Sequence, residues 1–352
     1  MQTFALMRGV HMSVTIKDIA KRVGVAPSTV SRVVNGSASI SEETKSRILQ
    51  VMEEMNYHPN SLARNLVNGS TFCIGLIMDA RDEGTFSNTF FNRSVYAIEK
   101  VTQANGYNLL IANDDSSMGV SAVEKLVLEK KADGLILPSN CVRTGLVEML
   151  LRNECPFVVL GEPAVMKKEA CWVDANNEEG AKEAVLHLAK EGFERIAFLL
   201  ENRNTVFAEK RLAGYLEGIR TAGLEENPDF IRECGQPEQG GSIAEHMLEE
   251  KKRPDAFLCS NNVIAYHVLQ TLKRKNISVP GETGVVTFDN YPFAQYMDPP
   301  LTAVDVDTFG IGEQAAFQLI HKIKRADSGN QQTLISTRLL VRESSRRGEV
   351  NE

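Results

Sequence analysis

The chain has 352 residues, of which 43% are hydrophobic and 24% are charged, and its formal net charge is −7. This composition is typical of a globular protein, and the length predicts two or three domains. No apolar run approaches the ~18 residues that span a bilayer, and the N-terminus lacks the features of a signal peptide, so we expect a cytoplasmic protein that contacts no membrane.

Charge is distributed unevenly along the chain. Residues 1–70 carry eight basic and five acidic side chains, which gives them a net charge of +3 and leaves −10 for the remaining residues. The net charge of the whole chain is therefore an average over a small basic part and a large acidic part. Only the small part is suited to a polyanionic partner.

Three short helices are predicted in the basic part. Thr15 fits a capping box at the start of the first helix, and Gly24 is expected to end it. Pro27 suits the first turn of the second helix, and Ser41 is expected to cap the third. Apolar residues recur at helical spacing in all three, and they are Ile16, Ile19, Ala20, Val23, Val30, Val33, Val34, Ile48, Val51, Met52 and Met55.

Two short helices joined by a tight turn that contains glycine form a helix-turn-helix. On the second helix, polar side chains lie opposite the valines, and they are Ser28, Ser31, Arg32 and Asn35. Such side chains can reach phosphates and base edges of DNA. The alternative interpretation is a small three-helix scaffold with a solvated face.

The segment YHPNSLARNLVNGST, residues 57–71, follows the third helix. Pro59 should break the preceding helix, and Asn68-Gly69 should end a helical stretch of about eight residues. A lone helix of that length is marginal in water, so this segment is expected to need a partner in order to form.

From residue 72 onward, apolar strand-like runs alternate with amphipathic helical stretches. The ten runs are CIGLIMDA, YNLLIAND, DGLILPS, PFVVLGE, CWVDA, RIAFLL, FIRECG, DAFLCSN, GVVTFDN and LTAVDV. This alternation predicts an α/β fold with parallel sheets. Ten strands are more than one compact sheet of this kind usually holds, so we predict two similar subdomains with a cleft between them.

Motifs of common enzyme classes are absent from the sequence. It contains no GxSxG, P-loop, HExxH or dinucleotide-binding glycine pattern, and the glycine-rich stretch GQPEQGGS is interpreted as a loop. The six cysteines have no zinc-binding spacing and are expected to be reduced thiols in apolar surroundings. The sequence therefore predicts no enzyme activity, no metal and no cofactor.

The segments TIKDIAKRVGVAPSTVSRVVNG and NYHPNSLARNLVNG, with the spacing between them, resemble the N-terminal signature of the LacI/GalR family of bacterial transcription regulators. The resemblance covers about residues 13–345, and Met12 is expected to be nearer the natural start unless the preceding stretch is a disordered tail. It implies a helix-turn-helix head over 13–58, a hinge helix over 59–70, and a periplasmic-binding-protein-like core of two doubly wound parallel-sheet α/β subdomains over 71–345.

The resemblance also implies which residues contact DNA. Those of the head, in the major groove or at its phosphates, are Thr15, Pro27, Ser28, Ser31, Arg32 and Asn35. Those of the hinge, in the minor groove, are Ala63, Arg64 and Leu66. Ser28 and Arg32 would read bases, and Leu66 would be an apolar wedge between base pairs. The implied partner is a near-palindromic double-stranded operator bound by a homodimer.

A small effector is expected in the cleft of the core. The residues implied to contact it are Asp79, Phe90, Phe91, Arg211, Asn261 and Asp289. Carboxylate, amide and guanidinium groups suit sugar hydroxyls, and aromatic rings suit the apolar face of a sugar. Two alternatives remain open, since Arg211 and Asp289 could form a structural ion pair and Phe90 could be a core residue.

The stretches FSNTFF, TVFAEKRLAGY and FDNYPFAQYMDPPLTAVD are most similar to the maltose- and maltodextrin-responsive branch of the family. The sequence thus predicts a sugar-responsive, homodimeric transcriptional repressor. The alternatives are a regulator of the same type that uses a different effector or a corepressor protein, and a sugar-binding protein without a regulatory role.

Overall fold

A computed structural model of the chain describes residues 14–34, 40–57, 69–79, 89–114, 121–325 and 329–347. It divides into two compact units, Met1–Thr71 and Phe72–Glu352, which we call the head and the core. Within the described segments, no helix combines the length and the apolar character needed to cross a membrane.

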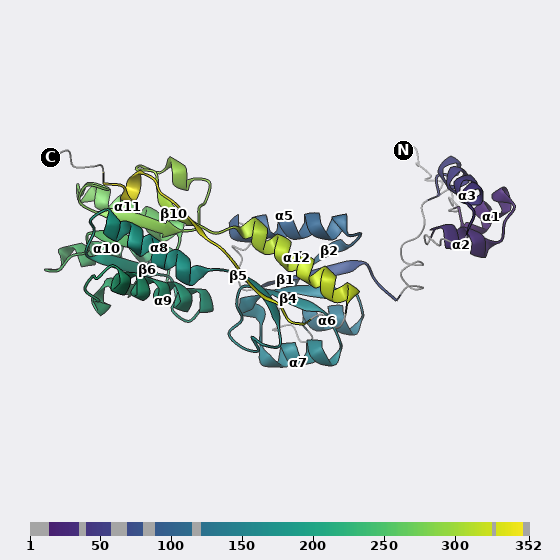
Figure 1. Cartoon of the computed structure of the whole chain (residues 1–352), viewed down its shortest axis with the longest axis horizontal. Coiled ribbons are helices and arrows are strands. Elements are labelled where there is room, and N and C mark those ends of the chain that lie inside the picture. Colours follow the sequence, from purple (N-terminus) through teal and green to yellow (C-terminus); the bar gives the residue numbers. More distant parts are fainter. Residues whose placement is uncertain are drawn as a thin grey trace, which may run out of the picture. The chain divides into compact units, whose positions relative to one another are not determined.

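The described residues of the head form three helices, α1 (Ile16–Val23), α2 (Pro27–Val34) and α3 (Glu42–Glu54) (Figure 1). Their bounds agree with the helices predicted from sequence. The predicted apolar stripes supply the buried residues of the head, which are Ile19, Ala20, Val23, Val30, Val33, Ile48 and Met52. One polar contact ties the helices together, because the Arg47 Nη2 on α3 donates to the Val23 carbonyl at the end of α1 over 3.0 Å.

The first lobe of the core, which we call the N-lobe, is a six-stranded parallel sheet of order β11-β5-β4-β3-β1-β2. Its strands are β1 (Cys73–Asp79), β2 (Asn108–Asp114), β3 (Gly134–Pro138), β4 (Phe157–Leu160), β5 (Cys171–Ala175) and β11 (Gln332–Ile335). Its helices are α5 (Thr89–Ala104), α6 (Ala122–Leu128), α7 (Thr144–Arg152) and α12 (Thr308–Lys324).

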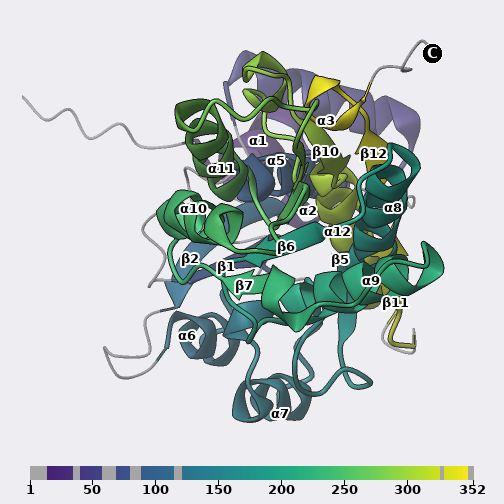
Figure 2. The same cartoon turned by 90° about the vertical axis from the view of Figure 1, so that its left-hand side faces the viewer.

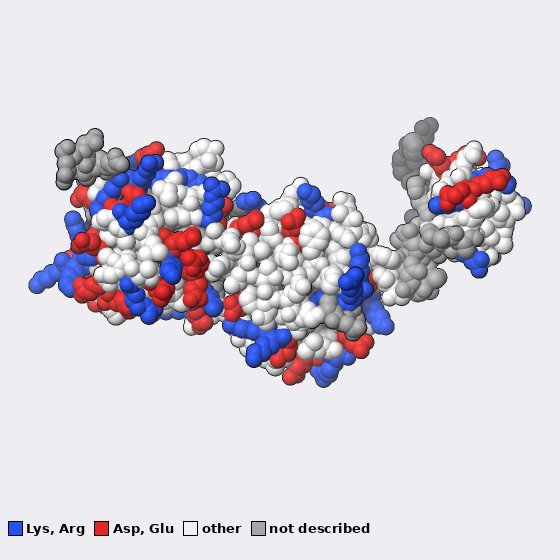
Figure 3. Space-filling view, viewed as in Figure 1, with Lys and Arg blue, Asp and Glu red and all other residues white. Residues whose placement is uncertain are grey.

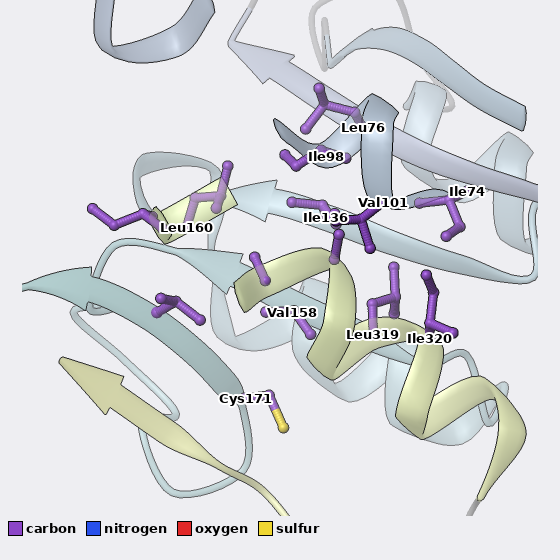
Figure 4. Packing of buried hydrophobic residues seen from close by; sticks show 14 of the residues in the cluster. Ile74, Leu76, Ile98, Val101, Ile136, Val158, Leu160, Cys171, Leu319 and Ile320 are labelled. Carbon is purple, nitrogen blue, oxygen red and sulfur yellow. The ribbon is translucent and has the colours of Figure 1, made fainter. Parts of the chain in front are cut away.

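In the N-lobe, α5 and α12 lie side by side on one face of the sheet, and α6 and α7 lie on the other face (Figure 1). Figure 4 shows how Leu319 and Ile320 of α12 pack over Ile136 and Val158 of the sheet. Both faces are covered by helices, which explains why the strands read as continuous apolar runs in the sequence.

The second lobe, the C-lobe, is a sheet of order β12-β10-β9-β8-β6-β7 in which only β12 is antiparallel among the described pairs. Its strands are β6 (Ile196–Leu200), β7 (Ile231–Glu233), β8 (Ala256–Cys259), β9 (Gly284–Phe288), β10 (Thr302–Asp305) and β12 (Arg338–Leu340). Its helices are α8 (Asn177–Lys190), α9 (Val206–Thr221), α10 (Gly240–Glu249) and α11 (Asn262–Arg274). Figure 2 shows α10 and α11 to the left of β6, and α8 and α9 to its right.

The chain passes between the two sheets three times, from β5 to α8, from β10 to α12, and from β11 to β12. Neither lobe is therefore a continuous piece of sequence. Each of the ten predicted runs contains one of the strands β1 to β10, and the α/β class with two doubly wound subdomains is confirmed.

The interpretation of GQPEQGGS as a loop is wrong in its second half, because Gly240 is the first residue of α10. A Cβ atom at Gly240 would lie 2.8 Å from Ile264 on α11, and one at Gly241 would lie 3.0 Å from the His267 carbonyl oxygen. These glycines allow two helices to pack closely, which a local sequence pattern does not distinguish from a turn.

Four of the six cysteines, Cys141, Cys171, Cys234 and Cys259, are buried, and Cys73 and Cys155 are half-buried. Burial raises the pKa of the Cys155 and Cys234 thiols to about 12 in each case. These thiols are protonated at neutral pH, so they behave as the small apolar side chains expected from the sequence.

Gly214 provides a test of the packing between α8 and α9. A Cβ atom at Gly214 would lie only 1.9 Å from the Glu178 carbonyl oxygen, which is backbone and cannot turn away. We expect Gly214→Ala to lower the free energy of unfolding by at least about 2 kcal/mol. Denaturant-induced unfolding followed by circular dichroism would measure this change.

Gly145 on α7 is the matched control, because a Cβ atom there has no described neighbour within 4 Å. Gly145→Ala should leave the stability unchanged or raise it by up to about 1 kcal/mol, as expected for alanine in a helix. Similar effects of the two substitutions would contradict the close packing of α8 on α9.

Candidate functional site

The outer face of α2 carries polar side chains, as the sequence predicted. Pro27, Ser28 and Arg32 are exposed and Ser31 is half-buried, whereas Val30 on the opposite face is fully buried. Pro27 is the first residue of the helix. The exposed serine hydroxyl and guanidinium are therefore available to a partner that lies against α2.

Thr15 is engaged within the head itself. Its backbone N–H and its hydroxyl both donate to the Asp18 carboxylate, over 2.9 and 2.7 Å. These hydrogen bonds, with that of the hydroxyl first, hold the pKa of Asp18 below its ordinary value. A hydroxyl has one proton, so Thr15 can donate to a phosphate only by releasing Asp18.

Charge is segregated within the described head. Residues 14–34, which form α1 and α2, carry four basic side chains and one acidic one, whereas residues 40–57, which include α3, carry two basic and four acidic ones. A band of acidic side chains is visible on this unit in Figure 3. An anionic partner is therefore attracted to α1 and α2 rather than to α3.

Several of the residues expected to bind DNA or effector belong to segments that the structure does not describe. Asn35, Ala63, Arg64 and Leu66 lie outside the described residues. Phe90 belongs to α5, but its side chain also lies outside the described part.

A hollow that is partly open to solvent lies between the two lobes of the core. The C-lobe contributes the carboxyl ends of β9 and β10, and the N-lobe contributes Arg93 of α5 and Thr308, the first residue of α12. The residues that line it are Arg93, Asp289, Asn290, Tyr291, Asp305, Val306 and Thr308. Of the residues predicted to bind effector, Asp289 is the one among these, and its backbone has a left-handed φ of 65°.

Arg211 on α9 is buried behind Asp289. Its Nε donates to Asn177 Oδ1 over 2.8 Å, and its Nη1 donates to the Ser260 carbonyl over 2.7 Å. Its Nη2 lies 3.8 Å from Asp289 Oδ1, and its guanidinium carbon lies 3.9 Å from the centroid of the Phe288 ring. The guanidinium is thus held on several sides by protein groups.

The same network extends toward the sheet of the N-lobe. Asn177 Nδ2 donates to Asp174 Oδ1 over 3.4 Å, and Asp174 lies on β5. Burial raises the pKa of Asp289, and the nearby Arg211 opposes that rise. Burial also raises the pKa of Asp174 and lowers that of Arg211. A chain of buried polar groups therefore connects β5 with the hollow.

Arg211 and Asp289 form an ion pair, as the alternative interpretation predicted, but the 3.8 Å between Nη2 and Oδ1 is too long for a hydrogen bond. The Asp289 side chain retains 19% of its exposed area, whereas that of Arg211 retains 9%. Asp289 is therefore the member of the pair that can reach a ligand, and Arg211 holds it from behind.

The other expected effector residues have contacts of their own. Asn261 caps α11 by accepting from the Ile264 N–H over 2.9 Å, and its Nδ2 donates to Glu201 Oε2 over 3.1 Å. Asp79, at the end of β1, accepts from Asn140 Nδ2 over 2.9 Å. Phe91 packs against the core of the N-lobe. None of these three side chains lines the described hollow.

Sequence reasoning missed several residues of the hollow. Asn290 and Tyr291 directly follow Asp289, and Asp305 ends β10, so their positions after strands were a usable signal. Nothing in the sequence was a reason to select Arg93, because a single arginine on an amphipathic helix is ordinarily predicted to be exposed to solvent. Burial raises the pKa of Tyr291 to about 12, so its hydroxyl stays protonated and can donate at neutral pH.

The groups in the hollow are suited to a polar organic ligand. Carboxylates and an amide can accept hydrogen bonds from hydroxyl groups, and a phenol, an amide and a guanidinium can donate. Among the described residues, no group of three or more His, Cys, Asp or Glu side chains could hold a metal ion.

Two protein families match parts of this chain. Residues 15–60 match the model of the bacterial regulatory proteins of the lacI family, and residues 185–345 match that of the periplasmic binding protein-like domain. Among curated proteins, the HTH-type transcriptional regulator MalR of Streptococcus pneumoniae is 29% identical over 327 residues, which cover 91% of this chain and 96% of MalR.

The HTH-type transcriptional repressor PurR of Aliivibrio fischeri is also 29% identical, over 318 residues that cover 89% of this chain and 93% of PurR. Among solved structures, the complex of the transcriptional regulator CelR with cellobiose is similar with a TM-score of 0.70 and 26% identity, over 94% of this chain and 99% of CelR. Both the head and the core thus match proteins that are named as transcriptional regulators.

The position of Arg211 leads to a prediction about stability. Arg211→Met should lower the free energy of unfolding by about 3 kcal/mol, because it leaves the Asp289 carboxylate without its cation. Arg211→Met combined with Asp289→Asn should lose less than the single variant, since the uncompensated charge is gone. Denaturant unfolding of both variants and of Asp289→Asn would complete the cycle, and simple additivity would contradict the coupling.

Proposed function

We propose that a small sugar bound between the two lobes of the core controls the binding of this chain to an operator. The chain joins a helix-turn-helix domain of the lacI family to a periplasmic binding protein-like domain, and it is a DNA-binding transcriptional regulator rather than an enzyme. The single observation that carries the proposal is the interlobe hollow with Asp289 at its wall. The sugar is proposed to be maltose or a maltodextrin.

The chemistry of the hollow supports a sugar. Asp289 and Asp305 supply carboxylate acceptors, and Asn290 and Tyr291 supply groups that can donate. Neutral sugars present many hydroxyls, each of which needs a partner when it leaves water. The structure of CelR with cellobiose, which is 26% identical to this chain, is a further argument for a sugar in this site.

The names of the relatives do not decide the effector, because MalR and PurR are equally similar to this chain. The equal similarity to PurR favours, as the second candidate, a regulator of the same type with a different effector. A corepressor protein that binds the core is the other form of that alternative.

We further propose that the head, residues 13–58, and the hinge, 59–70, bind DNA while the core, 71–345, senses the effector. In the head, Ser28 and Arg32 read bases beside Pro27, and Thr15, Ser31 and Asn35 contact phosphates. In the hinge, Leu66 inserts between base pairs, with Ala63 and Arg64 against the DNA. Two copies of the chain bind the two halves of a near-palindromic operator.

Control of DNA binding requires that the effector favour one arrangement of the lobes over another. A difference of ~1–3 kcal/mol in binding free energy between the two arrangements is sufficient for a 5- to 150-fold change in operator affinity. Asp289 and the carboxyl ends of β9 and β10 belong to one lobe, and α5 belongs to the other, so a ligand that contacts both walls of the hollow selects their separation.

A thermal-shift screen of sugars tests the sensor. A sugar at ~100 times its dissociation constant should stabilise the chain by ~2.7 kcal/mol. Asp289→Ala should abolish this stabilisation and the effect of the sugar on operator binding, because the ligand loses a carboxylate acceptor. Operator binding without sugar should be retained, as measured by fluorescence anisotropy. An unaltered sugar response in this variant would place the effector elsewhere.

Arg32→Ala tests the role of the α2 face. It should weaken operator binding by about 1–3 kcal/mol and reduce the preference for operator over unrelated DNA, because a base-reading guanidinium is lost. Arg22→Ala is the control, since it removes the same charge from the exposed surface of α1. Equal loss of sequence preference in both variants would contradict the assignment of base reading to Arg32.

A further inference from the structure

Three charged side chains line the hollow, and they come from both lobes. Arg93 extends from α5 of the N-lobe, whereas Asp289 and Asp305 lie at the carboxyl ends of β9 and β10 of the C-lobe. The hollow therefore has a wall with one cation opposite a wall with two carboxylates. Of these three charged residues, only Asp289 was identified from the sequence as a candidate effector contact.

The two carboxylates differ in their partners. Asp289 has the buried Arg211 guanidinium behind it, with 3.8 Å between Nη2 and Oδ1. The Asp305 carboxylate forms no ion pair or hydrogen bond with any described residue, although Arg338 lies opposite it in the β10–β12 ladder. The negative charge of Asp305 therefore acts on the hollow itself, and it adds to the rise of the pKa of Asp289.

Arg93 likewise has no partner among the residues that the structure describes. Its side chain is exposed and makes no ion pair or side-chain hydrogen bond within the described part of the chain. The lining of the hollow carries one cation and two carboxylates, and Arg211 offsets the charge of Asp289 from behind. A ligand with a negative charge would therefore lie beside the Asp305 carboxylate, which has no ion-pair partner among the described residues and would repel it.

Thr308 gives an independent sign that this hollow receives a ligand. It lines the hollow and is only 7% exposed, yet its Oγ1 atom has no hydrogen-bond partner among the described residues. A buried hydroxyl without a partner costs free energy, and a ligand hydroxyl would supply the missing hydrogen bond.

We propose that Asp305, opposed by Arg93, selects an uncharged polyhydroxylated effector and rejects its phosphorylated form. This inference rests on the proposed function and specifies the charge of the ligand. Asp305 accepts hydrogen bonds from ligand hydroxyls, and its charge repels a phosphate ester. Arg93 donates to ligand oxygens from the opposite wall and limits the repulsion.

Isothermal titration of the full chain with maltose, and with maltose 6′-phosphate, tests the selection. The wild-type chain should bind maltose at least about tenfold more tightly than the phosphate ester, which corresponds to ~1.4 kcal/mol. Asp305→Asn keeps the shape of the side chain but removes its charge. It should weaken maltose binding and strengthen binding of the ester, and so reduce the preference to about threefold or less.

Arg93→Ala should have the opposite effect on the ester. Without the cation the hollow is more negative, so binding of maltose 6′-phosphate should fall further, whereas Arg93→Lys should retain the wild-type preference. Asp229→Asn is the matched control, because that carboxylate is 75% exposed and does not line the hollow. Melting temperatures without ligand would establish that each variant is folded.

The outcomes separate this inference from the proposed function. An equal change in affinity for both ligands in Asp305→Asn would overturn the selection, because a merely structural role affects both alike. Tighter binding of the phosphate ester by the wild-type chain would also overturn it and would leave sugar control intact. If neither these two ligands nor any sugar of the screen binds, both the selection and sugar control are wrong.

Discussion

The buried guanidinium of Arg211 is the group around which the polar centre of the core is organised. It contacts the carbonyl after β8, the amide that begins α8, the carboxylate after β9 and the ring of Phe288. A charge at this depth is costly unless it is surrounded by acceptors and an opposite charge. The positions of Asn177, Ser260 and Asp289 relative to one another are therefore fixed by a single side chain.

This organisation explains why Asp289 and Arg211 have different roles although the sequence suggested the same one. All but a small part of the arginine is enclosed, whereas the carboxylate reaches the hollow. The arginine thus positions a ligand-binding group and links it through Asn177 to β5 of the other lobe. Polar contacts through Arg211 and Asn177 thus connect the hollow to β5, from which the chain passes to the other sheet.

Much of the fold could be predicted because its signals are local. The stripes of α1 to α3, the N-cap at Ser41 and the runs of β1 to β10 follow directly from apolar periodicity. The strand β11 was missed because it has four residues, two of them polar, and lies at the edge of a sheet where exposed and half-buried residues alternate. The close packing of the α10 glycines and the position of Arg93 at the hollow depend on contacts between segments that are distant in the sequence. Such contacts produce no periodic pattern in the sequence.

The three passages of the chain between the lobes have a consequence for synthesis on the ribosome. The sheet of the N-lobe receives α12 and β11 only after the intervening C-lobe segment has been made, which is about 130 residues after β5. At 5–20 residues per second this delay is on the order of ten seconds. During that time, apolar residues such as Ile136 and Val158 lack their cover, whereas the head is already complete. A nascent chain of this protein is thus exposed to aggregation and to chaperones at one defined sheet face.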